Sequence, residues 1–95
     1  MADHQLVHAS HARQVSNLTM LHDAAYAALE QEKVNRCRRG ITGLEIARLC
    51  GVTLQAMEAY AAAVEGLSWP VPRRVLQEIR LHQLLLGVRR SAARS

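Results

Sequence analysis

The sequence predicts an all-α domain of four to five helices, and three observations support this fold class. Apolar residues make up 49% of the chain, whereas aromatic residues make up 3% and Phe is absent, so aliphatic and alanine side chains must fill the core. Apolar residues recur at three- and four-residue steps over several segments. Residues 42–65 carry the signals of two short helices joined by a tight turn. A chain of 95 residues has the length of one domain.

Residues 1–16 are expected to form an N-terminal arm or a short helix. His4, His8 and His11 would lie on one face of such a helix, where they could bind a metal ion. A histidine cluster without Cys or carboxylate support is more often a solvated segment, so we expect no metal site and no cofactor. No apolar window approaches the ~18 residues of a membrane span, and the start of the chain lacks a hydrophobic signal region. We therefore expect a cytoplasmic protein.

Residues 17–39 have the periodicity of a helix. Three- and four-residue steps run through six residues of this segment: Leu18, Leu21, Ala25, Ala28, Leu29 and Glu32. Ser16 or Asn17 can cap the start, and Glu30, Glu32 and Lys33 are expected to keep one face in solvent. The segment ends in three closely spaced arginines: Arg36, Arg38 and Arg39. These arginines either complement the helix dipole or clamp DNA phosphates. We favour the clamp, because the two short helices follow directly.

The two short helices are expected to meet at Gly51. Thr42 begins a capping box with Glu45, in which hydroxyl and carboxylate satisfy orphan backbone donors. Gly40 before the box suits a left-handed cap. Gly51 is expected to take a left-handed conformation at the turn, because glycine has the smallest cost there. Thr53 can then cap the second helix.

This stretch resembles the helix-turn-helix of phage and plasmid repressors. Ala47 is followed four residues later by Gly51, and Met57 comes six residues after that. The resemblance covers about a quarter of the chain and places the helix-turn-helix at 42–65 within a helical DNA-binding region at 17–66. One departure is Cys50, where such repressors usually have Leu.

The resemblance implies that the second helix of the motif enters the major groove. The residues expected to meet base edges are Thr53, Leu54, Gln55, Ala56, Glu58 and Ala59. Gln55 can pair with adenine and Glu58 with cytosine. This helix carries no Lys or Arg, so affinity must come from phosphate contacts elsewhere. The candidates are Arg36, Arg38, Arg39, Thr42 and Arg48.

Residues 67–95 are expected to hold a dimerisation helix and a basic tail. Pro72 can start the helix, whose inward face would carry Val75, Ile79 and Leu86. A second apolar face, nearly opposite, consists of Leu81, Leu84, Leu85 and Val88. A helix that is apolar on two sides must be covered on both. A second copy of the chain is the favoured cover, and an N-terminal segment folded back over this face is the alternative.

These features together predict a sequence-specific repressor that binds double-stranded DNA as a homodimer. The net charge of +4 favours an acidic partner, and no catalytic motif is present, so no enzyme is expected. The whole chain also resembles the small Kor-type repressors of broad-host-range bacterial plasmids. That resemblance implies palindromic operators and other plasmid regulators as partners. The rivals are a protein-interaction module of the antitoxin or adaptor type and a His-rich metal-responsive regulator.

Overall fold

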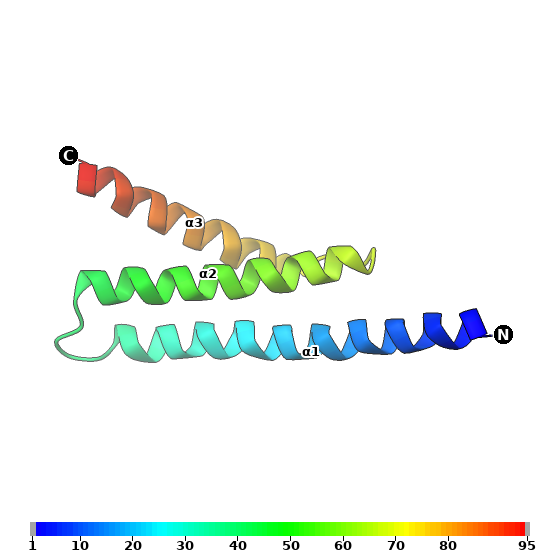
Figure 1. Cartoon of the computed structure of the whole chain (residues 1–95). Helices are drawn as coiled ribbons and strands as arrows, with labels where there is room; N and C mark the ends of the chain where they lie inside the picture. The colour runs from blue at the N-terminus through cyan, green and yellow to red at the C-terminus, as the bar shows by residue number, and fades with distance from the viewer. Residues whose placement is uncertain (1, 95) are drawn as a thin grey trace.

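The chain forms three helices in a computed structural model, which describes residues 2–94 and the side chains of residues 12–87. Helix α1 spans Ala2–Arg36, α2 spans Gly43–Gly66 and α3 spans Arg73–Arg94 (Figure 1). The predicted all-α class is confirmed, and residues 2–94 contain no strand. The predicted number of four to five helices is wrong, because two pairs of expected elements have merged.

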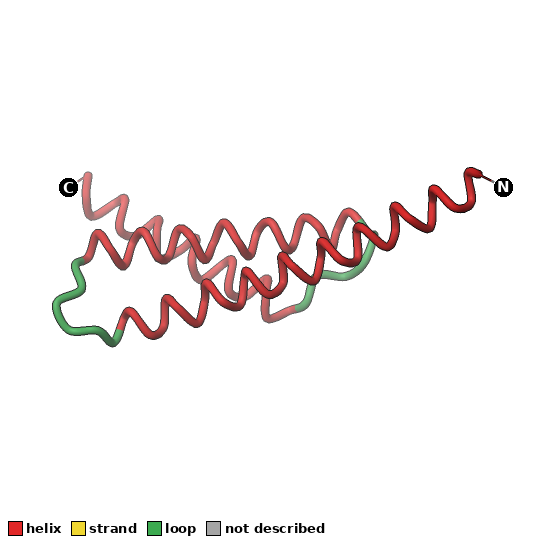
Figure 2. The backbone as a smooth tube through the Cα atoms, turned by 60° about the horizontal axis from the view of Figure 1, so that its bottom comes forward, coloured by secondary structure: helices red, strands yellow, loops and turns green. Residues whose placement is uncertain are grey.

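The first merger joins the expected N-terminal arm to the helix that follows it. Helix α1 runs without a break through Ser16 and Asn17, so neither residue caps a helix start. Helix α2 ends beside the part of α1 around Gln14, since Gln14 and Gly66 line the same small surface hollow. The first turns of α1 therefore extend beyond the rest of the bundle (Figure 2).

The α1–α2 connection follows the sequence prediction at Gly40 and Thr42, whereas the Glu45 carboxylate, predicted to accept from a backbone N–H, pairs with Arg38. Gly40 has a φ of 78°, in the left-handed region. Thr42 is the N-cap of α2, and its side-chain oxygen accepts a hydrogen bond from the Glu45 backbone N–H at 3.1 Å. The Glu45 carboxylate accepts a 2.6 Å hydrogen bond from Arg38 across the connection. Cap and ion pair together fix where α2 begins.

The second merger removes the predicted turn at Gly51. Helix α2 is continuous from Gly43 to Gly66, and Gly51 does not have a positive φ. The buried positions of α2 follow one unbroken helical stripe: Cys50, Thr53, Met57, Tyr60, Ala61 and Val64. Burying this stripe outweighs the roughly 1 kcal/mol that one glycine costs inside a helix. Thr53, expected as a cap, is buried in mid-helix instead.

The core lies on both sides of α2. Its buried members are Leu18, Ala25 and Leu29 of α1, Met57, Tyr60, Ala61 and Val64 of α2, and Val75 of α3. Helix α2 packs against α1 and against α3, whereas the backbones of α1 and α3 do not approach each other. Helix α3 begins against α2 and diverges from it toward the C-terminus (Figure 1). The middle helix therefore carries both interfaces.

The α2–α3 connection occupies residues 67–72. Ser68 has a φ of 58°, and the Trp69 backbone N–H bonds back to Val64 O at 3.2 Å. The Trp69 side chain is 44% exposed. Pro72 was predicted to be the first helical residue, but α3 begins one residue later, at Arg73. The backbone oxygen of Pro72 accepts a hydrogen bond from the Leu76 N–H.

The molecule is long for its mass. Its radius of gyration is 17.0 Å and its extents are 61 × 25 × 20 Å, whereas a compact chain of this length has a radius of gyration of about 12 Å. The accessible surface is 7176 Å², against about 5,500 Å² expected for a compact monomer of this mass. No helix within residues 2–94 has an apolar stretch long enough to cross a bilayer.

Candidate functional site

The residues expected to contact phosphate lie together at one end of the molecule. They come from three consecutive segments, namely the end of α1, the α1–α2 connection and the start of α2: Arg36, Arg38, Arg39, Thr42 and Arg48. Arg38 is paired with Glu45, and Arg36 lies 2.6 Å from Glu32. Arg39 and Arg48 are exposed and form no ion pair with another described residue. Arg38 and Arg48 also line a shallow groove of about 350 Å³ between α1 and α2.

The residues expected to read bases do not form one surface. Thr53 is fully buried, and its hydroxyl lies 3.1 Å from Leu49 O and 3.3 Å from Ala28 O. Leu54 and Ala56 are partly buried, whereas the exposed members are Gln55, Glu58 and Ala59. The prediction for Thr53 is therefore wrong, because the continuous α2 turns this residue into the core.

The leucines expected to form a dimer interface are also divided. Leu81 and Leu84 are 50% and 60% exposed. Leu85 is partly buried beside the α1–α3 cleft, and the Val88 side chain lies outside the described residues. On the inward face Val75 is buried and Ile79 packs against the core, as predicted. The alternative was an N-terminal segment folded back over α3; in the described part of the chain the backbone of α1 does not approach α3, and the side chains of residues 1–11 lie outside the described residues.

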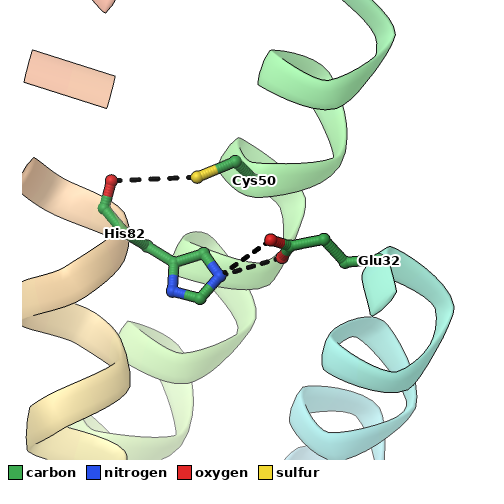
Figure 3. A group of neighbouring side chains, drawn as sticks. All are labelled: Glu32, Cys50 and His82. Atoms are coloured by element: carbon green, nitrogen blue, oxygen red, sulfur yellow. Dashed lines mark hydrogen bonds and ion pairs between the residues drawn. The ribbon is translucent and has the colours of Figure 1, made fainter. Parts of the chain in front are cut away.

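The most unusual feature of the core is polar. Glu32 from α1, Cys50 from α2 and His82 from α3 point toward one another between the three helices (Figure 3). Each of the three residues is 2% exposed. Buried groups of this kind are costly unless they are paired. The pairing of these side chains therefore decides what the cluster is.

Glu32 and His82 form a direct pair. The His82 Nε2 lies 2.8 Å from Glu32 Oε2 and 3.2 Å from Glu32 Oε1. The His82 Nδ1 lies 2.7 Å from the backbone oxygen of Glu78, which can only accept, so Nδ1 carries a hydrogen. An ionised carboxylate also only accepts, so Nε2 carries a hydrogen as well. In this arrangement His82 donates from each ring nitrogen, from Nδ1 to the Glu78 backbone oxygen and from Nε2 to the Glu32 carboxylate.

Several groups keep Glu32 ionised. Burial raises the pKa of the Glu32 carboxyl, but hydrogen bonds from Thr53 and His82 and the charges of His82 and Arg36 outweigh burial and lower this pKa below its ordinary value of 4.5. Arg36 donates to Glu32 Oε1 at 2.6 Å from a position that is 40% exposed. The Thr53 hydroxyl carries a single proton, so it shares that proton among three nearby acceptors: Leu49 O, Ala28 O and the Glu32 carboxylate.

Cys50 completes the cluster without forming a catalytic dyad. Its thiol donates to the His82 backbone oxygen, with Sγ 3.8 Å from that oxygen. Both ring nitrogens of His82 are engaged by Glu32 and Glu78, so neither is placed to take the thiol proton. Neither Cys37 nor Cys50 forms a disulfide. The cluster holds helices together and offers metal-ligand chemistry, since its three ligand atoms lie within 4.8 Å of one another.

Sequence reasoning missed this cluster although two signals were present. Glu32 continues the inward stripe that contains Ala25 and Leu29, so the face it was expected to keep in solvent is a buried one. His82 similarly lies one helical turn after Ile79 on the inward face of α3. A charged and a titratable residue on two buried stripes indicate a buried pair.

Comparison with known proteins found no match to the chain among protein-family models, curated proteins or solved structures.

Proposed function

We propose that the chain binds double-stranded DNA as a homodimer and represses transcription from the bound operator, as the resemblance to Kor-type repressors implies. The grouping of cations at one end of the bundle is the observation that carries the proposal. Lys33, Arg36, Arg38, Arg39 and Arg48 lie at this end, and the last turns of α3, which ends at Arg94, return toward it (Figure 1). Such a patch is typical of a surface that contacts phosphates.

The outward face of α2 continues from this basic end. Arg48, Gln55 and Ala59 share one face, because seven and eleven residues are close to whole numbers of helical turns. In the proposed complex Arg48 contacts a phosphate, and Gln55 and Glu58 reach base edges in the major groove. The groove admits an α-helix, so a continuous α2 can enter it without the turn that the sequence predicted at Gly51.

A second copy is supported by the surface of the molecule. The chain exposes about 1,700 Å² more than a compact monomer of its mass would. Stable interfaces bury about 800 Å² on each partner. Leu81 and Leu84 lie exposed on α3, which makes this helix the proposed interface.

Binding of the purified chain to random duplex DNA at several salt concentrations tests the proposal. Arg48→Ala should lower the slope of log affinity against log salt by about one. Arg73→Ala is the matched control, because Arg73 is an exposed arginine at the opposite end of the bundle. Gln55→Ala should cost about 1–3 kcal/mol only on duplexes selected from a random pool. Equal loss for Arg48→Ala and Arg73→Ala, or no duplex binding, contradicts the proposal.

A protein-interaction module is the second candidate. Large apolar side chains are more than 40% exposed on all three helices: Met20, Val34, Leu44, Val52, Leu76, Leu81 and Leu84. The outward face of α2 also carries Glu45, Glu58 and Glu65, which phosphates repel. Two results together favour this candidate over the first. The chain co-purifies with a second protein at a fixed stoichiometry, and the wild-type chain binds duplex DNA no more tightly than Arg48→Ala does.

A further inference from the structure

We propose that Glu32, Cys50 and His82 form a binding site for one Zn²⁺ ion. Each of the three helices supplies one ligand, and each of these residues is 2% exposed. Carboxylate, thiolate and imidazole are ligands that zinc accepts in proteins, whereas Mg²⁺ and Ca²⁺ prefer oxygen alone. The site lies beside the proposed DNA surface and shares Arg36 with it, because Arg36 pairs with Glu32.

The distances require a small contraction. The ligand atoms lie within 4.8 Å of one another. Tetrahedral zinc, with bonds of about 2.0–2.3 Å, holds neighbouring ligand atoms about 3.3–3.8 Å apart. Because no pair of ligand atoms is more than 4.8 Å apart, Cys50 must approach the other two by at most about 1 Å. The Glu32–His82 pair, now at 2.8 Å, must open slightly as the ion replaces the shared proton.

The surroundings already orient both Glu32 and His82 for an ion. His82 Nδ1 donates to the Glu78 backbone oxygen at 2.7 Å, which directs Nε2 toward the cluster as the ligand atom. Metal-bound histidines commonly donate their other nitrogen to such a carbonyl. Arg36 holds Glu32 Oε1, which leaves Oε2 as the ligand. These contacts remain intact when the ion is bound.

Charge balance favours the exchange of two protons for one Zn²⁺ ion. Without metal the cluster contains a Glu32 carboxylate, a His82 imidazolium and a neutral Cys50 thiol, so its sum is zero. Binding releases one proton from the imidazolium and one from the thiol, and no bond to carbon changes. The ion of charge +2 then faces a thiolate, a carboxylate and a neutral imidazole, so the sum stays zero. The buried site therefore gains no net charge.

A path to the cluster exists. A cleft of about 130 Å³ between α1 and α3 is lined by Glu32 and His82, with Lys33, Arg36 and Leu85 among the residues at its walls. Water entering by this cleft can supply the fourth ligand. A bound ion would tie α3 to α1, two helices whose backbones do not otherwise meet.

Cobalt titration of the metal-free full chain tests the site. Co²⁺ in place of Zn²⁺ should give the visible bands of a tetrahedral ion and a sulfur-to-cobalt charge-transfer band at one equivalent. Each equivalent of Zn²⁺ should displace the cobalt, and the unfolding temperature should rise with Zn²⁺ concentration. Cys50→Ser should abolish the charge-transfer band, and His82→Gln should weaken binding roughly 100-fold or more.

Two controls separate this site from other ligands. Cys37→Ser removes the exposed cysteine and should leave the spectrum unchanged. Replacing His4, His8 and His11 by Ala removes the N-terminal histidines and should also leave it unchanged. If Cys50→Ser does not fold, the spectrum of Cys37→Ser still identifies Cys50 as the sulfur ligand. No charge-transfer band in the wild type, or loss of the band in either control, overturns the proposal.

Discussion

The carboxylate of Glu32 and the imidazole of His82 lie 2.8 Å apart although fifty residues separate them in the chain. They come from α1 and α3, two helices whose backbones do not approach each other. Both side chains are almost completely buried, whereas Arg36, which pairs with Glu32, is 40% exposed. The pair is therefore a direct polar link between two helices whose backbones stay apart, and several predictions depend on it.

Breaking the pair on one side should be costly. His82→Leu leaves the Glu32 carboxylate buried without its imidazolium, and the expected loss is about 3–5 kcal/mol in the free energy of unfolding. Replacing both Glu32 and His82 by Leu should recover most of this loss, because no buried charge remains. Urea denaturation measures each corner of the cycle. Gln77→Leu, at an exposed position of α3, is the control and should change stability by less than about 0.5 kcal/mol.

Acid should destabilise the protein through Glu32. Because the pKa of Glu32 in the folded chain lies below 4.5, the folded chain binds fewer protons than the unfolded chain in this range. Its stabilisation is complete above pH 4.5 and is lost as the pH falls through the lower folded pKa. Denaturant titrations between neutral pH and pH 3 should show a decline that is smaller in Glu32→Gln. The same decline in both proteins would assign it to other carboxylates.

Glycine substitutions distinguish a continuous α2 from two helices with a turn. A methyl group at Gly51 meets no atom within 4 Å, so Gly51→Ala should raise stability by about 0.5–1 kcal/mol in a continuous helix. Gly40→Ala should instead lower stability by about 1–2 kcal/mol, since Gly40 has a φ of 78°. Thermal unfolding measures both. A loss of stability in Gly51→Ala would restore the turn that the sequence predicted.

Dimerisation through α3 is best tested at Leu84. Leu84→Glu should shift a dimer to monomers with little loss of helix, because Leu84 is 60% exposed in the single chain. Leu85→Glu is a poorer test, since Leu85 also lines the cleft beside Glu32 and His82. Sedimentation at micromolar concentration measures the change. Leu44→Glu, at a more exposed leucine of α2, should remain dimeric; a monomeric Leu44→Glu would move the interface to α2.

Local chemistry made part of this fold predictable. Gly40 and Thr42 were identified correctly because a left-handed glycine and a threonine cap act within a few residues. Val75 and Ile79 were placed on the inward face by helical periodicity alone. These features need no knowledge of the rest of the chain.

Features that depend on neighbouring helices were not predictable in the same way. The chemistry around Gly51 fits a turn, but packing against α1 and α3 buries Cys50, Thr53 and Met57 on one stripe and keeps the helix intact. Whether Glu32 faces solvent or His82 depends on where α3 lies. The base-reading set failed at Thr53 for the same reason.

The arrangement of helices around α2 also sets the order in which the chain opens. Helix α3 packs its backbone against α2 alone and meets α1 through side chains, at the cluster and where Arg74 lies over the Tyr26 ring, so it has the fewest interactions to break. Its amide hydrogens should exchange with solvent through a partial opening that leaves the α1–α2 hairpin closed. The stiff connection through Pro70 and Pro72 makes that opening a swing of the whole helix. The rate of hydrogen exchange at the α3 amides therefore measures whether the buried Glu32–His82 pair is intact.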